Sequence, residues 1–226
     1  MTRPDIAFAC NKLASGQTVR SDRHWKELDR CITYLIGTRD VALELGGGAT
    51  DLRLVGFVDA DDAGDRQSRS STSGYIFTLG GAAILWASKR IKCVTLSPTE
   101  SEYICVVEAG KEARKLRFLL AEYGLLDKDE TTMLDVDNQS TIAVSEEMAL
   151  KGSLRHMERW YMWLQQMVER RKLKLQYNLT NTLPADYLTK AMLFPEFDRC
   201  FVRVGQVQLF AKGSIEEVSS EEEKVP

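Results

Sequence analysis

Four carboxylates stand where elements of regular structure begin or end, and together they could bind metal ions. Asp59 closes an apolar segment whose alternating side chains predict a strand over residues 52–59. Asp137 follows a second short strand, and Asp186 lies in the first turn of a predicted helix. Because α/β proteins bind ligands at the ends of sheet strands, we expect these acids to converge.

The fourth acid, Glu102, is placed on a buried face by helical periodicity. The segment 99–123 predicts a long helix in which one stripe comprises Glu102, Val106, Ala109, Ala113, Leu116 and Leu120. This stripe is otherwise apolar and should face the sheet, where an acid is costly unless it has a partner. Glu100 begins a different stripe, which continues to Lys111 and Lys115 and should run out to solvent.

Each acid also has a plainer interpretation. Asp137 could be the N-cap of the helix that follows it. Glu102 and Asp186 could be acids favoured by the dipole at a helix start. Together, however, converging carboxylates repel one another unless a divalent cation neutralises them. Mg²⁺ prefers such oxygen ligands, Mn²⁺ accepts them, and two ions about 4 Å apart hold a phosphodiester for attack by water.

The composition excludes several other kinds of site and protein. Five scattered cysteines without a CxxC pair, and only two histidines, argue against a disulfide framework and a zinc site. No apolar run approaches the roughly 20 residues that span a bilayer. The N-terminal sequence MTRPDIAFACNKLASG lacks the pattern of a secretory signal. We therefore expect an intracellular protein, cytoplasmic or nuclear, with no membrane association.

Charge is distributed unevenly along the chain. The net charge is −3, of which residues 215–226 contribute −4, so the remainder carries +1. The acidic tail is typical of a disordered end. Three basic clusters are Lys89, Arg90 and Lys92; Lys111, Arg114, Lys115 and Arg117; and Arg170, Arg171, Lys172 and Lys174. Such clusters are either solvated helix faces or sites for phosphate.

The order of predicted elements indicates a mixed sheet with helices packed on it. Residues 1–50 are mainly helical, with a helix that starts after Ser21 and stops at Gly37. A hairpin with a Gly80-Gly81 turn follows the first strand. After the long helix come a strand, a short helix, a helix over 153–171, a charged strand and a last helix beginning at LPADYLTKAM. This order is typical of an α/β or α+β domain.

Six segments, in this order, resemble the ribonuclease H domain of copia-type LTR retrotransposon polyproteins. They are LVGFVDADDAGD, RSSTSGYIFTLGGAAILWASKR, LSPTESEYICVVEAGKEARKLRFLL, DVDNQSTIAV, RHMERWYMWLQQMVE and LPADYLTKAM. RPDIAFACNKLA and HWKELDRCITYLIGTRD resemble the end of the preceding reverse transcriptase, so the resemblance covers roughly residues 3–192. It implies an RNase H-like fold, with a five-stranded mixed sheet flanked by helices.

The resemblance also divides the chain into three parts. Residues 1–50 would be a mainly helical connection segment, and residues 51–192 the RNase H-like domain. Residues 193–226 would be an extension that ends in the acidic tail.

The implied activity is hydrolysis of the RNA strand of RNA–DNA hybrids with two Mg²⁺ ions. The family's four catalytic acids fall on Asp59, Glu102, Asp137 and Asp186. In this family pattern one ion is held by the first three and the other by Asp59 and Asp186, while basic clusters bind phosphate. Nucleic-acid contacts are expected at Asn138 and Gln139, and at Ser71 and Thr72, for which capping a loop is an equal alternative.

The sequence departs from the family pattern at positions that do not remove a catalytic acid. Asp62 stands where tryptophan is usual, Pro98 replaces a serine, and Glu158 replaces an aspartate after His156. A polymerase Tyr-x-Asp-Asp motif is missing, so we expect the chain to be a piece or a remnant of a longer polyprotein and its partners to include the polymerase part. The alternative function is a catalytically silent module that binds nucleic acid or a protein.

Overall fold

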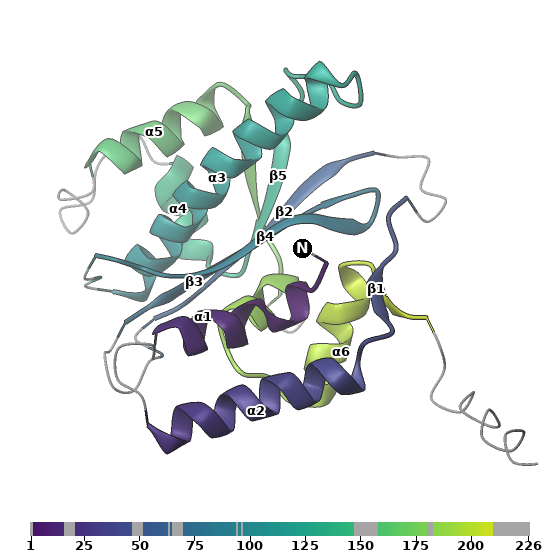
Figure 1. Cartoon of the computed structure of the whole chain (residues 1–226). Coiled ribbons are helices and arrows are strands. Elements are labelled where there is room, and N and C mark those ends of the chain that lie inside the picture. The colour runs from purple at the N-terminus through teal and green to yellow at the C-terminus, as the bar shows by residue number, and fades with distance from the viewer. Residues whose placement is uncertain are drawn as a thin grey trace, which may run out of the picture.

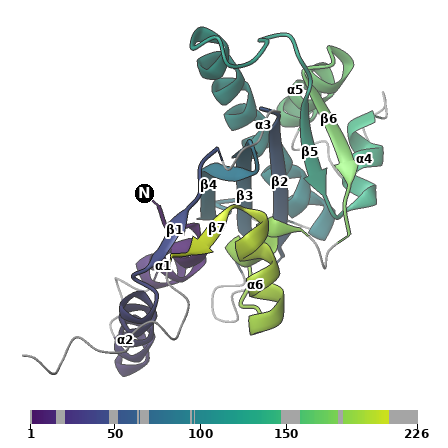
Figure 2. The ribbon, with the colours of Figure 1, turned by 90° about the vertical axis from the view of Figure 1, so that its right-hand side faces the viewer.

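A five-stranded sheet forms the centre of the protein, with helices on both faces (Figure 1). The computed structural model describes residues 2–15, 21–46, 52–62, 64, 70–93, 95, 97–146, 158–179 and 183–209. The strands are β2 (Leu54–Asp61), β3 (Thr72–Leu79), β4 (Ala82–Arg90), β5 (Thr132–Val136) and β6 (Leu173–Tyr177). Their order across the sheet is β4-β3-β2-β5-β6 (Figure 2). Strand β3 is antiparallel to both of its neighbours, whereas β2, β5 and β6 are parallel. The predicted mixed sheet is therefore confirmed.

Two apolar cores lie on opposite faces of the sheet. One face is covered by α3 (Pro98–Glu122), α4 (Gln139–Glu146) and α5 (Glu158–Glu169), whose apolar side chains pack with Val58 and Val136 of the sheet. The other face is covered by α1 (Ala7–Ser15), the 3-10 helix η4 (Pro184–Leu188) and α6 (Phe194–Arg203), which pack with Phe57 and Ile76. Alternating residues of β2 thus enter different cores, as the pleat of a strand requires.

Local sequence signals explain the elements that lead to the carboxylates. Gly80 and Gly81 both have positive φ, 59° and 85°, which suits the two-residue turn of the β3–β4 hairpin. Helix α3 begins at Pro98, and the Ser97 hydroxyl accepts a hydrogen bond from the backbone N–H of Glu100 at 3.3 Å. Gly124, with φ of 71°, follows the end of α3. These signals fix where the helix that carries Glu102 begins and ends.

The N-terminal part is joined to the C-terminal part by a second, two-stranded sheet. After α2 (Asp22–Gly37) the chain forms β1 (Val41–Leu43), which pairs antiparallel with β7 (Gln206–Gln208). Figure 2 shows this pair beside α6, on the α1 and α2 side of the large sheet. A 3-10 helix, η1 (Pro4–Ile6), precedes α1. The prediction of a mainly helical N-terminal part and a separate extension missed this pairing, because three-residue strands leave no periodic pattern.

Asp5 of η1 connects the N-terminal and C-terminal parts through hydrogen bonds. Its buried carboxylate accepts hydrogen bonds from Arg3 at 2.7 Å, from the Tyr34 hydroxyl at 2.8 Å and from the Gln206 amide at 2.8 Å. The partners belong to the N-terminus, to α2 and to β7. The predicted acidic tail, residues 215–226, lies outside the described residues.

Two predictions about individual elements were wrong. The last segment forms a single 3-10 turn, η4, followed by α6, rather than one helix from LPADYLTKAM. Glu100 was expected to be exposed to solvent, but its side chain is buried, with 1% exposed. Every side chain from Glu100 to Val107 is buried because this part of α3 is enclosed on all sides, so helical periodicity cannot separate an inner from an outer face there. Among the described helices, none is both long and apolar enough to cross a membrane.

Candidate metal and active site

Three of the four predicted acids come together at one end of the sheet. Single carboxylate oxygens of Asp59, Asp137 and Asp186 all lie within 4.8 Å of one another. Asp59 and Asp186 are buried, each 3% exposed, and Asp137 is half-buried. They come from β2, from the residue after β5, and from η4. Residues from three separate elements therefore form one carboxylate cluster.

The parallel pairing of β2 with β5 places two of these acids side by side. Val58 is in register with Val136, so the next residues, Asp59 and Asp137, follow at the same edge of the sheet. Asp59 has the same side-chain direction as Phe57, which packs towards η4 and α6. The carboxylate of Asp59 is thereby directed to the face on which Asp186 lies.

A glycine opposite Asp59 allows η4 to approach the sheet. Gly74 of β3 is the antiparallel partner of Asp59. A Cβ atom on Gly74 would lie 2.6 Å from Cγ2 of Thr189 and 2.8 Å from Cβ of Leu188, which is closer than real atoms pack. The Thr189 hydroxyl donates to Oδ2 of Asp59, and its oxygen lies 3.0 Å from the carbonyl oxygen of Asp186. Close packing at Gly74 thus sets the position of Asp186 against Asp59.

Glu102 reaches the same strand from the α3 side and lies outside the three-carboxylate group. Its Oε1 accepts a hydrogen bond from the backbone N–H of Ala60 at 3.2 Å. The side chain is buried, 6% exposed, on the apolar stripe that the sequence predicted. Glu102 therefore lies behind the end of β2, with Asp59 on the opposite face.

Burial and mutual repulsion raise the pKa values of these acids. Burial, followed by the charges of Asp59 and Asp137, raises the pKa of Glu102 to about 9. Burial and Asp59 raise the pKa of Asp186 to about 7, against the opposing effect of Lys190. Burial also raises the pKa of Asp59, although Lys190 and the hydrogen bond from Thr189 oppose the change. The protein alone therefore disfavours full ionisation of the cluster.

The donor set fits a hard divalent cation. Oε2 of Glu102 and Oδ1 of Asp186 are buried and have no hydrogen-bond partner among the described residues. Unsatisfied carboxylate oxygens are costly in a protein interior, and a divalent cation would satisfy and neutralise them. Oxygen ligands suit Mg²⁺ and Mn²⁺.

The other predicted contact residues lie in different environments. Asn138, not Asp137, caps α4, because its Oδ1 accepts the backbone N–H of Thr141 at 3.1 Å. Gln139 is exposed at the start of α4. Ser71 and Thr72 are buried, and the Ser71 hydroxyl donates to Asp62 at 3.0 Å. Asp62 also accepts hydrogen bonds from Thr95 and Ser101, so it organises a cluster of hydroxyls beside β2.

Sequence reasoning overlooked three residues that shape the site. Thr189 bonds Asp59, Lys190 pairs with Asp186 at 3.0 Å, and the buried Cys105 thiol donates to the carbonyl oxygen of Asp59 at 3.1 Å. The four-residue spacing from Asp186 to Lys190 was an available signal, because residues four apart in a helical turn are neighbours. The bonds from Thr189 and Cys105 depend on tertiary packing and leave no pattern in the sequence.

The chain is similar to parts of known transposon polyproteins, although no protein-family model matches it. It is 40% identical over 204 residues to the retrovirus-related Pol polyprotein from transposon TNT 1-94 of Nicotiana tabacum. It is 32% identical over 208 residues to that from transposon RE2 of Arabidopsis thaliana. These matches cover 90% and 92% of this chain but only 15% and 14% of the polyproteins. A shorter relative, secreted RxLR effector protein 161 of Plasmopara viticola, is 44% identical over 113 residues, which is 50% of this chain and 79% of that protein.

Solved structures with a similar arrangement include two ribonuclease H proteins. The N-terminal RNase H domain of a Mycobacterium tuberculosis protein has a TM-score of 0.46 at 13% identity, covering 66% of this chain and 96% of that one. LC11-RNase H1, solved in complex with an RNA/DNA hybrid, has a TM-score of 0.46 at 12% identity, covering 61% and 94%. The strand order β4-β3-β2-β5-β6 with β3 antiparallel, rather than these scores, identifies the fold as RNase H-like. With this similarity along most of its length, the chain belongs with the Pol polyproteins of copia-type retrotransposons, of which it corresponds to a segment with an RNase H-like fold.

Proposed function

We propose that this chain hydrolyses the RNA strand of RNA–DNA hybrids in a reaction that depends on a divalent metal ion. The observation that carries the proposal is the convergence of Asp59, Asp137 and Asp186 within 4.8 Å, with Glu102 behind the same strand end. An RNase H-like fold in a retrotransposon Pol segment supports the same activity. The rest of the polyprotein, including its polymerase part, is the expected partner.

The four acids are proposed to hold two Mg²⁺ or Mn²⁺ ions. Bound there, the ions would supply positive charge to the phosphodiester and lower the pKa of the attacking water. Asp59 lies between Glu102 on one side and Asp186 on the other, and so it is the residue suited to bind both ions. Loss of any one acid should therefore impair the site as a whole.

The surrounding residues are proposed to position these acids. Thr189 fixes the rotamer of Asp59 through its hydroxyl, and Cys105 holds the backbone of the same residue. Lys190 compensates part of the negative charge of Asp186. A site that is organised before substrate arrives needs less rearrangement during the reaction.

The hybrid is proposed to be recognised mainly by its shape and its 2′-hydroxyls. Gln139 is the best placed of the predicted contact residues, since it is exposed and two residues after Asp137. Asn138 is engaged as the cap of α4, and Ser71 bonds Asp62. These bonds favour the structural alternative for Ser71 over a direct contact with nucleic acid.

Cleavage of a labelled RNA–DNA hybrid in Mg²⁺ tests the proposal. We expect the wild type to cut the RNA strand, and Asp59→Asn and Glu102→Gln to lose activity by on the order of 100-fold or more. Asp198→Asn is the matched control, because it removes an exposed carboxylate of α6 that is not part of the cluster, and should retain activity. A folded wild type that binds the hybrid without cutting it would instead establish a silent binding module.

A further inference from the structure

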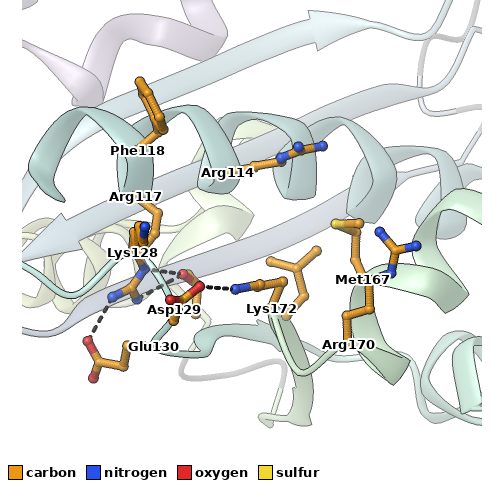
Figure 3. Close-up of a pocket in the computed structure, with 11 residues that line it drawn as sticks. Arg114, Arg117, Phe118, Lys128, Asp129, Glu130, Met167, Arg170 and Lys172 are labelled. Carbon is orange, nitrogen blue, oxygen red and sulfur yellow. Dashed lines mark hydrogen bonds and ion pairs between the residues drawn. The ribbon is translucent and has the colours of Figure 1, made fainter. Parts of the chain in front are cut away.

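A second feature, separate from the carboxylates, is a pocket of about 240 Å³ near the C-terminal end of α3 (Figure 3). Its walls come from α3, from the loop before β5, from the end of α5 and from the start of β6. It therefore lies at the amino ends of β5 and β6, whereas Asp137 follows the carboxyl end of β5. The carboxylate cluster and this pocket are at opposite ends of the same parallel strands.

The side chains that line the pocket carry an excess of positive charge. Five are cationic and two are acidic: Arg114, Arg117, Lys128, Arg170 and Lys172 against Asp129 and Glu130. The acids are already paired, Glu130 with Arg117 at 2.7 Å and Asp129 with Lys172 at 2.5 Å, as Figure 3 shows. The structure gives the remaining three cations no acidic partner within its described ranges. The pocket thus presents positive charge that its own acids do not neutralise.

A neighbouring hollow adds aromatic side chains to this surface. It is lined by Lys111, Arg114, Lys115, Phe118 and Trp163, so it shares Arg114 and Phe118 with the pocket. Phe118 is 62% exposed and projects from α3 on the side away from the ion pairs (Figure 3). The two hollows therefore form one surface that combines cations with the rings of Phe118 and Trp163. An exposed ring of this kind has no role in the packing of the core.

We propose that this surface binds a single nucleic-acid strand, with a phosphate in the pocket and a base against Phe118. Guanidinium groups bind phosphate oxygens through paired hydrogen bonds, and exposed rings among cations are typical of single-strand sites. Arg114 is twelve residues after Glu102 in α3, about 18 Å at 1.5 Å per residue. A single strand that runs along α3 from Glu102 would cover this distance in roughly five or six nucleotides at ~3.4 Å each. The inference rests on the proposed function for the class of ligand.

Fluorescence anisotropy with a labelled single-stranded DNA of twelve nucleotides, in EDTA, tests the proposal. Arg114→Gln/Arg170→Gln should weaken binding by about tenfold and reduce the slope of log Kd against log salt by about 0.7 for each lost phosphate contact. Phe118→Ala should weaken binding at least about fivefold with little change in that slope. The matched control is Lys26→Gln/Arg30→Gln, which removes the same charge from exposed positions of α2 and should bind as the wild type does.

Several outcomes would overturn the proposal. One is an unchanged affinity for the oligonucleotide in the Arg114→Gln/Arg170→Gln variant, and another is an equal loss of affinity in the α2 control. A third is that the Arg114→Gln/Arg170→Gln variant still binds the oligonucleotide but no longer binds a poly-glutamate peptide that the wild type binds. The last result would identify a site for acidic protein segments. Because binding is measured without metal, it is independent of cleavage. If the wild type does not cut hybrids but the Arg114→Gln/Arg170→Gln variant loses strand binding, the proposed hydrolase is refuted and the proposed strand-binding pocket is retained.

Discussion

The ammonium nitrogen of Lys190 lies 3.0 Å from Oδ2 of Asp186, so a side-chain cation already occupies one side of the carboxylate cluster. Asp186 is almost fully buried, and Lys190 is only half-buried. An ion pair of this kind compensates charge that would otherwise destabilise the folded state. A divalent cation bound to Asp186 would take over that compensation. Lys190 and a metal ion should therefore compete for the same carboxylate.

Lys190→Met should lower the free energy of unfolding in EDTA by about 1 kcal/mol, because it leaves Asp186 without its cation. In excess Mg²⁺ the variant should gain more in Tm than the wild type gains, because no ammonium competes with the ion. Thermal melts in the two buffers measure both effects. Lys115→Met, which breaks an exposed pair on α3, is the control and should show neither. Equal Mg²⁺ responses in all three proteins would refute the competition.

Gly74→Ala should separate η4 from the sheet. The added Cβ would lie 2.6 Å from Thr189 and 2.8 Å from Leu188, so η4 must shift, at a cost of about 1–3 kcal/mol in the free energy of unfolding. Hybrid cleavage should fall further than the stability loss explains, because Asp186 moves with η4. Gly37→Ala is the control, since its Cβ would meet nothing within 4 Å and should stabilise by about 0.5 kcal/mol. A fully active Gly74→Ala protein would show that the spacing of η4 is unimportant.

Asp5 should make stability depend on pH. Burial raises the pKa of Asp5, but the hydrogen bonds from Arg3, Gln206 and Tyr34 outweigh this effect and hold the pKa below its usual value. A lowered pKa in the folded state contributes stability above the unfolded pKa of about 3.9, and that stability is lost as the pH falls through the folded pKa. Asp5→Asn should lower the free energy of unfolding by about 2 kcal/mol at pH 7, and the difference in stability from the wild type should shrink below about pH 4. Urea unfolding of both proteins from pH 7 to below pH 4 measures this difference in stability. A difference that does not change with pH would contradict a stabilising role of the ionised Asp5.

Removal of residues 1–51 should lower the stability of the RNase H-like domain. Ala7 and Leu43 pack against the core that contains Phe57 and Ile76, and the deletion also takes away Asp5. We expect the shortened chain to unfold at a lower urea concentration and to bind more of a hydrophobic dye. A chain ending at residue 209 serves as the control and should match the full chain in both measurements. If the chain from residue 52 were equally stable, the N-terminal part would be an independent unit.

The sequence predicts those parts of the fold that short-range physics determines. The alternation around Phe57 and Asp59, the Gly80-Gly81 turn and the stripe of α3 each report on neighbours within a few residues. The alternation predicted the strand that carries Asp59, and the stripe predicted that Glu102 is buried. That these acids bind metal remains a prediction.

The parts that the sequence did not predict depend on distant contacts. Strand β1 has three residues and owes its existence to β7, far along the chain. The burial of Glu100 follows from the enclosure of the first turns of α3 on all sides. Thr189 acquires its role only because Gly74, on another strand, lets η4 approach. None of these relationships has a local period or motif.

The pairing of β1 with β7 has a consequence for the order in which the polypeptide is made. Asp5 leaves the ribosome 201 residues before its hydrogen-bond partner Gln206. Until that residue is translated, the edge of β1 has no strand beside it and the carboxylate of Asp5 lacks one of its donors. The segment that contains Asp5 and β1 is thus held in place only after the strands of the large sheet have been made, and a translational pause before β7 should prolong its exposure to chaperones and proteases.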